Sequence, residues 1–221
     1  MSDKRALIIG ASGGIGSALS DELSSRGFEV TRLSRSRDGL DVTDQLSVDR
    51  VLGALSGTFD TIIIASGILA PNGQSPEKSL DALTADNMAA LFAANAIGPA
   101  LVLRHVPRLL APGRSVVAVL TARVGSIGDN GLGGWYSYRA SKAAANQIVR
   151  TASIEIGRKQ KEAIVVSMHP GTVDTPFTES YPAHKKQQPD EAAANILNVL
   201  DGLTRDDNGD FFDWAGKRIP W

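Results

Sequence analysis

The chain has 221 residues, of which 43% are hydrophobic and 21% charged, so we expect one globular domain over residues 1–221. Its 23 basic and 24 acidic residues nearly balance, which excludes the strong positive charge that nucleic-acid binders need. It has no cysteine, which excludes disulfides, thiolate catalysis and zinc–thiolate sites.

Short apolar runs alternate along the chain with longer segments of helical periodicity. The runs predict strands, and several are continuously apolar, as in parallel strands buried on both faces; they cover residues 6–9, 29–33, 61–64, 115–120, 164–168 and 210–214. Helices are expected at residues 15–26, 85–110, 138–157 and 190–203. This alternation predicts an α/β fold, a doubly wound parallel sheet of the Rossmann type with helices on both faces.

The first predicted strand runs directly into a glycine-rich turn, GASGGIG. Gly10 permits a tight turn, Gly14 permits close approach of a pyrophosphate, and Gly16 lets the next helix lie against the strand. The amides at the helix N-terminus favour phosphate, and Ser12 and Ile15 belong to the same turn. A tight loop that merely contains glycine is the alternative. The strand before it and the helix after it favour dinucleotide binding.

The second strand ends in TRLSRSR. NAD sites usually carry Asp or Glu here for the ribose 2′-hydroxyl, whereas this chain has Ser34 followed by Arg35, with Arg37 beyond. Arginine fits a 2′-phosphate that a carboxylate would repel, so the pattern favours NADP(H) over NAD(H). The alternative is that these arginines only solvate a surface loop. Asp41 and Val42, expected after a short third strand, are placed to border the adenine.

The segment WYSYRASK puts Tyr138 and Lys142 four residues apart, on one face of a helix. A free phenol has a pKa near ~10, and a nearby ammonium lowers it toward the working range of an acid–base catalyst. The same ammonium can bind the ribose hydroxyls of a dinucleotide. Tyr136 is expected on the opposite side of the helix or in the loop. The four-residue spacing of Tyr138 and Lys142 occurs often by chance on helix surfaces. Here, however, the pair follows a predicted strand that ends at the same edge of the sheet as the glycine turn, which is where this fold binds ligands.

Together, the glycine turn, YRASK and PGTVDT resemble the short-chain dehydrogenase/reductase family over essentially the whole chain. The segments VGSIGDNGLGGWYSYRASK and GDFFDWAGKRIPW are similar to its C-factor-like branch, which also resembles sniffer-type carbonyl reductases. The resemblance implies about seven parallel strands and hydride transfer between NAD(P)(H) and a carbonyl carbon. It implies that Tyr138 and Lys142 are catalytic and that Asn95 holds a water near the lysine. It further implies cofactor contacts from Pro170, Gly171, Val173 and Thr175.

Two positions depart from the family pattern. The family commonly has Asn-Asn-Ala-Gly at the end of the strand predicted at residues 61–64, whereas this chain has Ile64-Ala65-Ser66-Gly67. Ser66 and Gly67 are expected to contact the cofactor. Another group must therefore satisfy the backbone that the missing asparagine braces. The serine that orients the substrate carbonyl falls on Ala122, a change that could lower turnover by ~10²-fold. Thr121, which would point to the opposite face, and Ser126, further into the loop, are the nearby hydroxyls, and Ser126 is the candidate catalytic group.

These features predict an NADPH-dependent carbonyl reductase acting on a small aldehyde, ketone or alcohol. An NADP(H)-binding signalling or sensor protein with little turnover is the alternative, motivated by Ala122 and by the C-factor resemblance. A purely structural role leaves the glycine turn unexplained.

We expect a substrate lid at about residues 175–188. The resemblance implies a homodimer or homotetramer through the apolar helix around Asn95. The three histidines are scattered without a carboxylate pattern, so no metal site is predicted. No apolar run approaches the ~18 residues of a membrane span and the N-terminus has no secretory pattern. We therefore expect a cytoplasmic protein that binds neither nucleic acid nor membrane.

Overall fold

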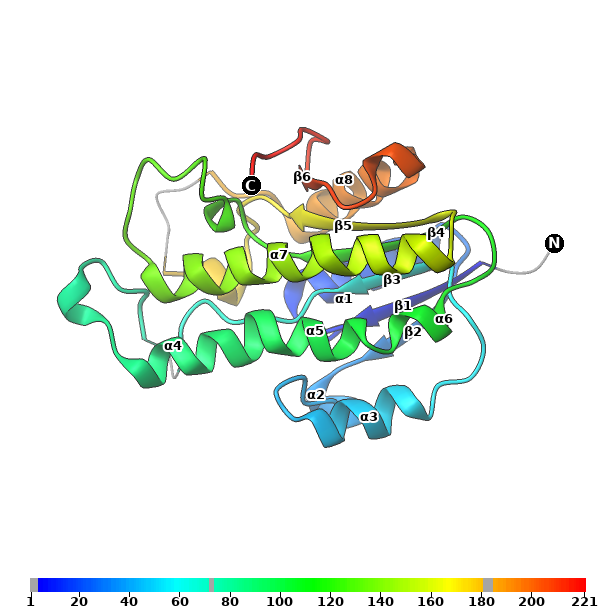
Figure 1. Ribbon diagram of the computed structural model, residues 1–221, viewed down its shortest axis with the longest axis horizontal. Helices are drawn as coiled ribbons and strands as arrows, with labels where there is room; N and C mark the ends of the chain where they lie inside the picture. Colours follow the sequence, from blue (N-terminus) through cyan, green and yellow to red (C-terminus); the bar gives the residue numbers. More distant parts are fainter. Residues whose placement is uncertain (1–3, 72–73, 181–184) are drawn as a thin grey trace.

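The computed structural model describes residues 4–71, 74–180 and 185–221, and its strands form one parallel sheet (Figure 1). The strand order is β2-β1-β3-β4-β5-β6. The strands are β1 (Arg5–Ile9), β2 (Glu29–Leu33), β3 (Thr61–Ile64), β4 (Ser115–Leu120), β5 (Ala163–His169) and β6 (Phe211–Asp213). The helices are α1 (Gly14–Ser25), α2 (Arg35–Asp38), α3 (Gln45–Gly53), α4 (Ala85–Phe92), α5 (Gly98–Leu103), α6 (Val106–Leu109), α7 (Tyr136–Lys159) and α8 (Pro189–Gly202).

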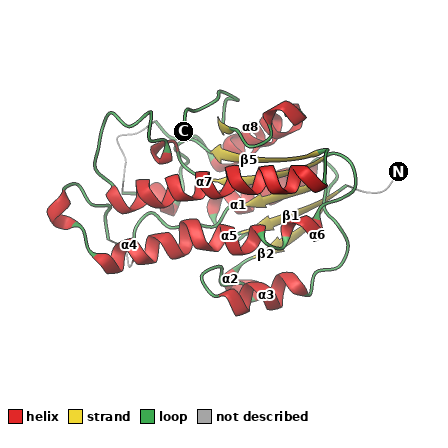
Figure 2. Ribbon diagram, viewed as in Figure 1, coloured by secondary structure: helices red, strands yellow, loops and turns green. Residues whose placement is uncertain are grey.

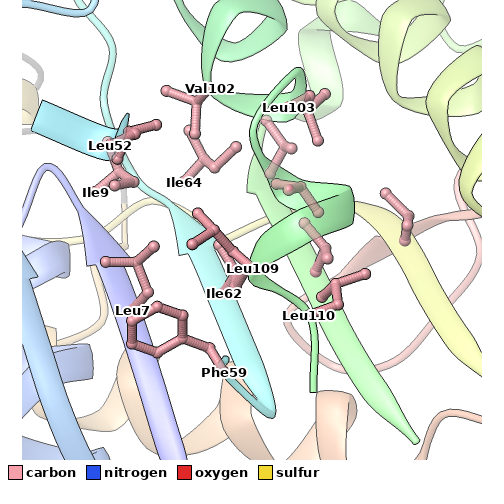
Figure 3. Packing of buried hydrophobic residues seen from close by; sticks show 14 of the residues in the cluster. Leu7, Ile9, Leu52, Phe59, Ile62, Ile64, Val102, Leu103, Leu109 and Leu110 are labelled. Carbon is pink, nitrogen blue, oxygen red and sulfur yellow. The ribbon is translucent and has the colours of Figure 1, made fainter. Parts of the chain in front are cut away.

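Helices cover both faces of the sheet, which confirms the predicted doubly wound α/β arrangement (Figure 2). Successive strand side chains point to opposite faces, so each apolar run supplies two cores. On one face, Leu7, Ile9 and their counterparts in β3 and β4 pack with residues of α3, α5 and α7 (Figure 3). On the other face, Ala6 and Ile8 belong to a second cluster with residues of α1 and α8.

The predicted strands lie within one residue of their observed bounds, but the described residues form six strands rather than about seven. The expected third strand is replaced by the helical turn α2. The Ser34 hydroxyl caps this turn by accepting from the Arg37 amide, and the Ser34 amide donates to the Asp38 carboxylate. Gly39 ends the turn with φ of 66°. These local hydrogen bonds occupy backbone groups that an edge strand would need.

The predicted helix 85–110 is divided into shorter pieces. Between α4 and α5 lies a π-helical turn, Ala93–Ile97, which has Asn95 at its centre. By length and composition alone, Ala85–Leu103 could cross a membrane, with a mean hydropathy of 1.3. A helix that packs on the core of a globular protein meets the same criteria, so this finding does not contradict the expectation of no membrane span. Val102 and Leu103 pack into the core cluster against the sheet, as in a helix that covers the core of a globular protein.

Substitution of Phe59, just before β3, tests the contribution of the core shown in Figure 3 to stability. The Phe59 side chain is 0% exposed, and its ring centroid lies 4.8 Å from the Arg5 guanidinium carbon. Phe59→Ala should lower the free energy of unfolding by about 3–5 kcal/mol, measured by urea denaturation. Leu46→Ala, at a side chain that is 76% exposed, is the control and should change it by less than ~0.5 kcal/mol. Equal losses in the two variants would contradict a stabilising role for this cluster.

Candidate active site

The carboxyl ends of β1, β3, β4 and β5 open onto one cleft of about 590 Å³. Its walls come from the glycine turn, the segments after β3, β4 and β5, and the start of α7. The strand order reverses between β1 and β3, and this switch point is where open α/β sheets bind their ligands. The structure therefore gathers at one edge most of the residues that the sequence singled out.

The glycine turn is packed too tightly for side chains. Gly10 has φ of 86°, and a Cβ there would lie 2.8 Å from the Ser66 amide nitrogen at the end of β3. A Cβ on Gly16 would lie 2.2 Å from the Gly10 carbonyl oxygen, and one on Gly14 would meet the Thr175 methyl at 2.5 Å. No side chain caps α1, so the amides of its first turn are available to a ligand. This donor set, with Ser12 and Ile15 in the same wall, fits a pyrophosphate.

The residues predicted to contact the 2′-phosphate and the adenine, Arg35, Asp41 and Val42, lie outside the walls of this cleft. Arg35 is the first residue of α2 and is exposed. The hydroxyl and amide of Thr43 hold the pKa of Asp41 below its ordinary value, and the nearby Arg35 adds a smaller electrostatic effect. Val42 packs against Gly98, where a Cβ would approach its methyl carbon to 2.9 Å. Arg35 and Asp41 are thus close enough to interact, next to the end of β2.

Tyr138 and Lys142 both line the cleft from α7 and are only 5% and 4% exposed. The Lys142 ammonium donates a 3.0 Å hydrogen bond to the Leu120 carbonyl at the end of β4 and lies 5.9 Å from the Tyr138 ring centroid. Burial raises the pKa of Tyr138 above its ordinary value and lowers the pKa of Lys142 to about 8. Burial therefore opposes the expected lowering of the phenol pKa. Tyr136 begins α7 and is half-buried outside these walls.

Asn95 is fully buried and holds three parts of the site together. Its side-chain oxygen accepts from the Ile68 amide at 2.8 Å, and its side-chain nitrogen donates to the Ile68 carbonyl at 2.9 Å and to the Ser141 hydroxyl at 3.1 Å. This answers which group braces the backbone after β3. A Cβ on Gly67 would lie 3.0 Å from the Asn95 oxygen and 3.3 Å from the Lys142 nitrogen, so a larger residue there would require these side chains to shift.

The structure does not bring Ser126 to the cleft. Ser126 is 2% exposed; its hydroxyl donates to the Pro220 carbonyl and accepts from the Asp129 amide. It thus anchors the C-terminal segment to the loop after β4 and is not placed to orient a substrate. Ala122 does line the cleft, and the neighbouring Thr121 hydroxyl is buried without a hydrogen-bond partner among the described residues.

The loop after β5 supplies the wall opposite α7. Pro170 and Thr175 line the cleft, and Gly171 has φ of 81°. Val173 is 1% exposed and pairs with Gln187 in a parallel bridge. Part of the predicted lid, Pro176–Thr178, forms a single 3-10 turn. Residues 181–184 of that lid lie outside the described residues.

Several wall residues were not singled out from the sequence, among them His169, Trp135 and Phe177. The His169 ring nitrogen Nδ1 is buried without a hydrogen-bond partner among the described residues, and burial lowers the pKa of His169 to about 4. The rings of Trp135 and Phe177 lie 6.0 Å and 6.4 Å from that of Tyr138. Trp135 has φ of 55°, which is rare for such a bulky residue. Trp135 is the first residue of WYSYRASK, and His169 and Phe177 flank PGTVDT, so position beside these motifs was the signal that could have identified them.

A family model described as enoyl-(acyl carrier protein) reductase matches residues 10–202. The chain belongs to the short-chain dehydrogenase/reductase family. A relative, 1-hydroxy-2-glutathionyl-2-methyl-3-butene dehydrogenase of Rhodococcus sp. strain AD45, is 31% identical over 97% of this chain and 98% of its own length. This result confirms the predicted family of NAD(P)-dependent oxidoreductases.

Two further similarities concern the branch and the fold. C-signal of Myxococcus xanthus is 38% identical over 61% of this chain and 79% of its own length. The solved structure of an NADPH-bound carbonyl reductase from chicken fatty liver aligns with a TM-score of 0.81 over 100% of both chains, at 23% identity. At that identity, the structural match establishes a common fold.

The buried ammonium of Lys142 should make stability depend on pH. Because its pKa is lowered from 10.5 to about 8, the unfolded chain binds more protons between these two values. Lys142→Met should therefore be more stable than the wild type at pH 7, and this advantage should shrink as pH rises from 8 to 10. Urea denaturation midpoints at both ends of that range measure it. Lys161→Met, at an exposed lysine, is the control. A difference that stays constant with pH for Lys142→Met would contradict the lowered pKa.

Proposed function

We propose that the protein is an NADPH-dependent carbonyl reductase that converts an aldehyde or ketone to an alcohol. The observation that carries this proposal is the burial of Tyr138 and Lys142 side by side in a cleft that the glycine turn also lines. Bound NADPH would supply the hydride that the carbonyl carbon accepts. The exposed Arg35 at the end of β2 would bind the 2′-phosphate, which a carboxylate would repel.

Tyr138 would donate its phenolic proton to the carbonyl oxygen as negative charge develops there. The phenol holds its proton at neutral pH, as a proton donor must, but its raised pKa makes it a weaker acid, so the reaction would need the phenolate to be stabilised as it forms. The Lys142 ammonium would then stabilise the phenolate. Its bond to the Leu120 carbonyl uses one of three donors and leaves two for the ribose hydroxyls.

Asn95 would act mainly by holding these groups in place. Both donors of its carboxamide are taken by Ile68 and Ser141, and its oxygen accepts from the Ile68 amide, so a relay water near Lys142 would be held by other atoms of the π-helical turn, such as its backbone carbonyl groups. Pro170, Gly171, Val173 and Thr175, together with Ser66 and Gly67, would form the nicotinamide and ribose walls.

The substrate side of the cleft favours an uncharged carbonyl compound with an apolar substituent. Leu69, Val124, Trp135 and Phe177 line it around Tyr138. Arg123 also lies there, but its guanidinium is already paired with Asp129 at 2.6 Å. Apolar walls with few polar groups bind through burial of apolar surface and use those polar groups for orientation.

A homodimer or homotetramer is supported by the helix that carries Asn95. Ile97 follows Asn95 by two residues and is 51% exposed, while the opposite side of the helix packs on α7 and the sheet. Pairing with a second copy would cover this apolar side chain.

A second candidate function is an NADP(H)-binding sensor or signalling protein with little turnover. Ala122 supports it because alanine cannot orient a carbonyl by hydrogen bonding. The similarity to C-signal of Myxococcus xanthus, a protein named as a signal, supports the same candidate.

Tyr138→Phe distinguishes the two functions. In a carbonyl reductase it should lower kcat by at least ~10²-fold with NADPH affinity unchanged, since only the proton donor is lost. NADPH oxidation with a panel of small carbonyls measures kcat, and fluorescence titration measures binding. Tyr136→Phe, two residues away and outside the cleft, is the matched control and should keep wild-type activity.

Full activity of Tyr138→Phe would overturn the mechanism. Tight NADPH binding without reduction of any carbonyl, in both the wild type and Ala122→Ser, would favour the sensor. If the wild type is active, Ala122→Ser should increase its turnover.

Arg35→Ser tests cofactor preference. Loss of a charge-assisted hydrogen bond to the 2′-phosphate should weaken NADPH binding by about 10–100-fold and leave NADH binding unchanged. Titration of both cofactors measures this, and Arg158→Ser, at an exposed arginine at the end of α7, is the control. Equal wild-type affinities for NADPH and NADH would contradict the role of Arg35.

A further inference from the structure

One buried carboxylate has no part in the chemistry proposed above. Glu77 belongs to the segment between β3 and α4, does not line the cleft and is only 5% exposed. Among the described residues, Asp213 is the other buried acid, and it accepts hydrogen bonds from amides a few residues further along the chain. The partners of Glu77 are instead about 60 residues away, at the start of α7.

Glu77 makes three hydrogen bonds to the first residues of α7. One side-chain oxygen accepts from the Ser137 hydroxyl in a short contact, and the other accepts from the Ser137 amide at 3.3 Å. The backbone carbonyl of Glu77 accepts from the Trp135 amide at 2.5 Å. Since Ser137 is 0% exposed, water cannot replace these partners.

The local sequence does not supply these contacts to α7. The residue before the helix is Trp135, which has φ of 55° and makes no side-chain cap, and the first turn contains no acidic residue. Helices usually begin with Ser, Thr, Asp or Asn, whose side chain accepts from an early amide. A carboxylate at this end also interacts favourably with the helix dipole. Glu77 therefore caps α7 from a distant part of the chain.

This distant cap lies directly beside the proposed proton donor. Ser137 immediately precedes Tyr138, and the Trp135 ring packs edge-on against the Tyr138 ring at 6.0 Å. We propose that Glu77 is a positioning residue that sets the place of the Tyr138 hydroxyl by capping α7, an inference that rests on the proposed carbonyl reduction. Displacement of a reacting group by about 1 Å can lower a rate by ~10²-fold, so a buried cap has catalytic consequences.

Steady-state kinetics of cap variants tests the proposal. Glu77→Ala should lower kcat by about 10–100-fold, while NADPH affinity stays within about twofold because the glycine turn is untouched. Glu77→Gln keeps acceptor oxygen and should recover most of the loss. Ser137→Ala removes one of the three bonds and should have a smaller effect, and the double variant should equal Glu77→Ala alone. Glu162→Ala, at an exposed glutamate before β5, is the matched control.

A second measurement separates failure of this proposal from failure of the proposed function. Hydrogen exchange of the amides of residues 135–138 should accelerate in Glu77→Ala and stay unchanged in Glu162→Ala, whether or not a carbonyl is reduced. Unchanged exchange would overturn the capping role. A kcat for Glu77→Ala within twofold of the wild type, or an equal loss of kcat and NADPH affinity, would overturn the positioning role. If Glu77→Ala does not fold, Glu77→Gln and Ser137→Ala carry the same comparisons.

Discussion

Burial of the strands on both faces is the constraint from which the rest of the structure follows. Residues 61–64 and 115–120 are apolar almost throughout, and helices cover the sheet on either side. Functional polar groups therefore have room only where strands end. The strand order reverses between β1 and β3, so the helices that follow them lie on opposite faces and leave a cleft. Tyr138 and Lys142 stand on the first turns of α7 at that edge, and Asn95 reaches it from the π-helical turn between α4 and α5.

Polar contacts between distant segments give this edge its shape. The Lys142 ammonium is bonded to the end of β4, the Asn95 carboxamide joins the segment after β3 to α7, and Glu77 caps the start of α7. Each group is buried, where an unsatisfied partner would be costly. These contacts connect α7 to three parts of the chain that are remote in sequence.

The family resemblance puts Ala122 where a substrate-orienting serine is expected, and alanine offers no hydroxyl for that role. The adjacent wall is apolar, with Trp135 and Phe177 beside the Tyr138 ring. Ser126, the nearest downstream hydroxyl, is occupied by the C-terminal segment. The polar groups left beside this wall to orient a substrate in the proposed reaction are thus Tyr138 and the Thr121 hydroxyl, which has no hydrogen-bond partner among the described residues. The largely apolar pocket around them accords with a reductase of uncharged carbonyl compounds.

The sequence by itself determined the fold class, the strands to within a residue, and the family, because periodicity and glycine spacing are local properties of the chain. Local hydrogen bonding that apolar periodicity does not reveal replaced the third strand with α2, since a serine cap and a left-handed glycine favour a turn over edge pairing. Tertiary structure alone decided two other matters. It directed Ser126 to Pro220, and it brought Glu77 to α7. These last two are contacts between segments far apart in sequence, and no spacing rule encodes which buried donor a distant acceptor will meet.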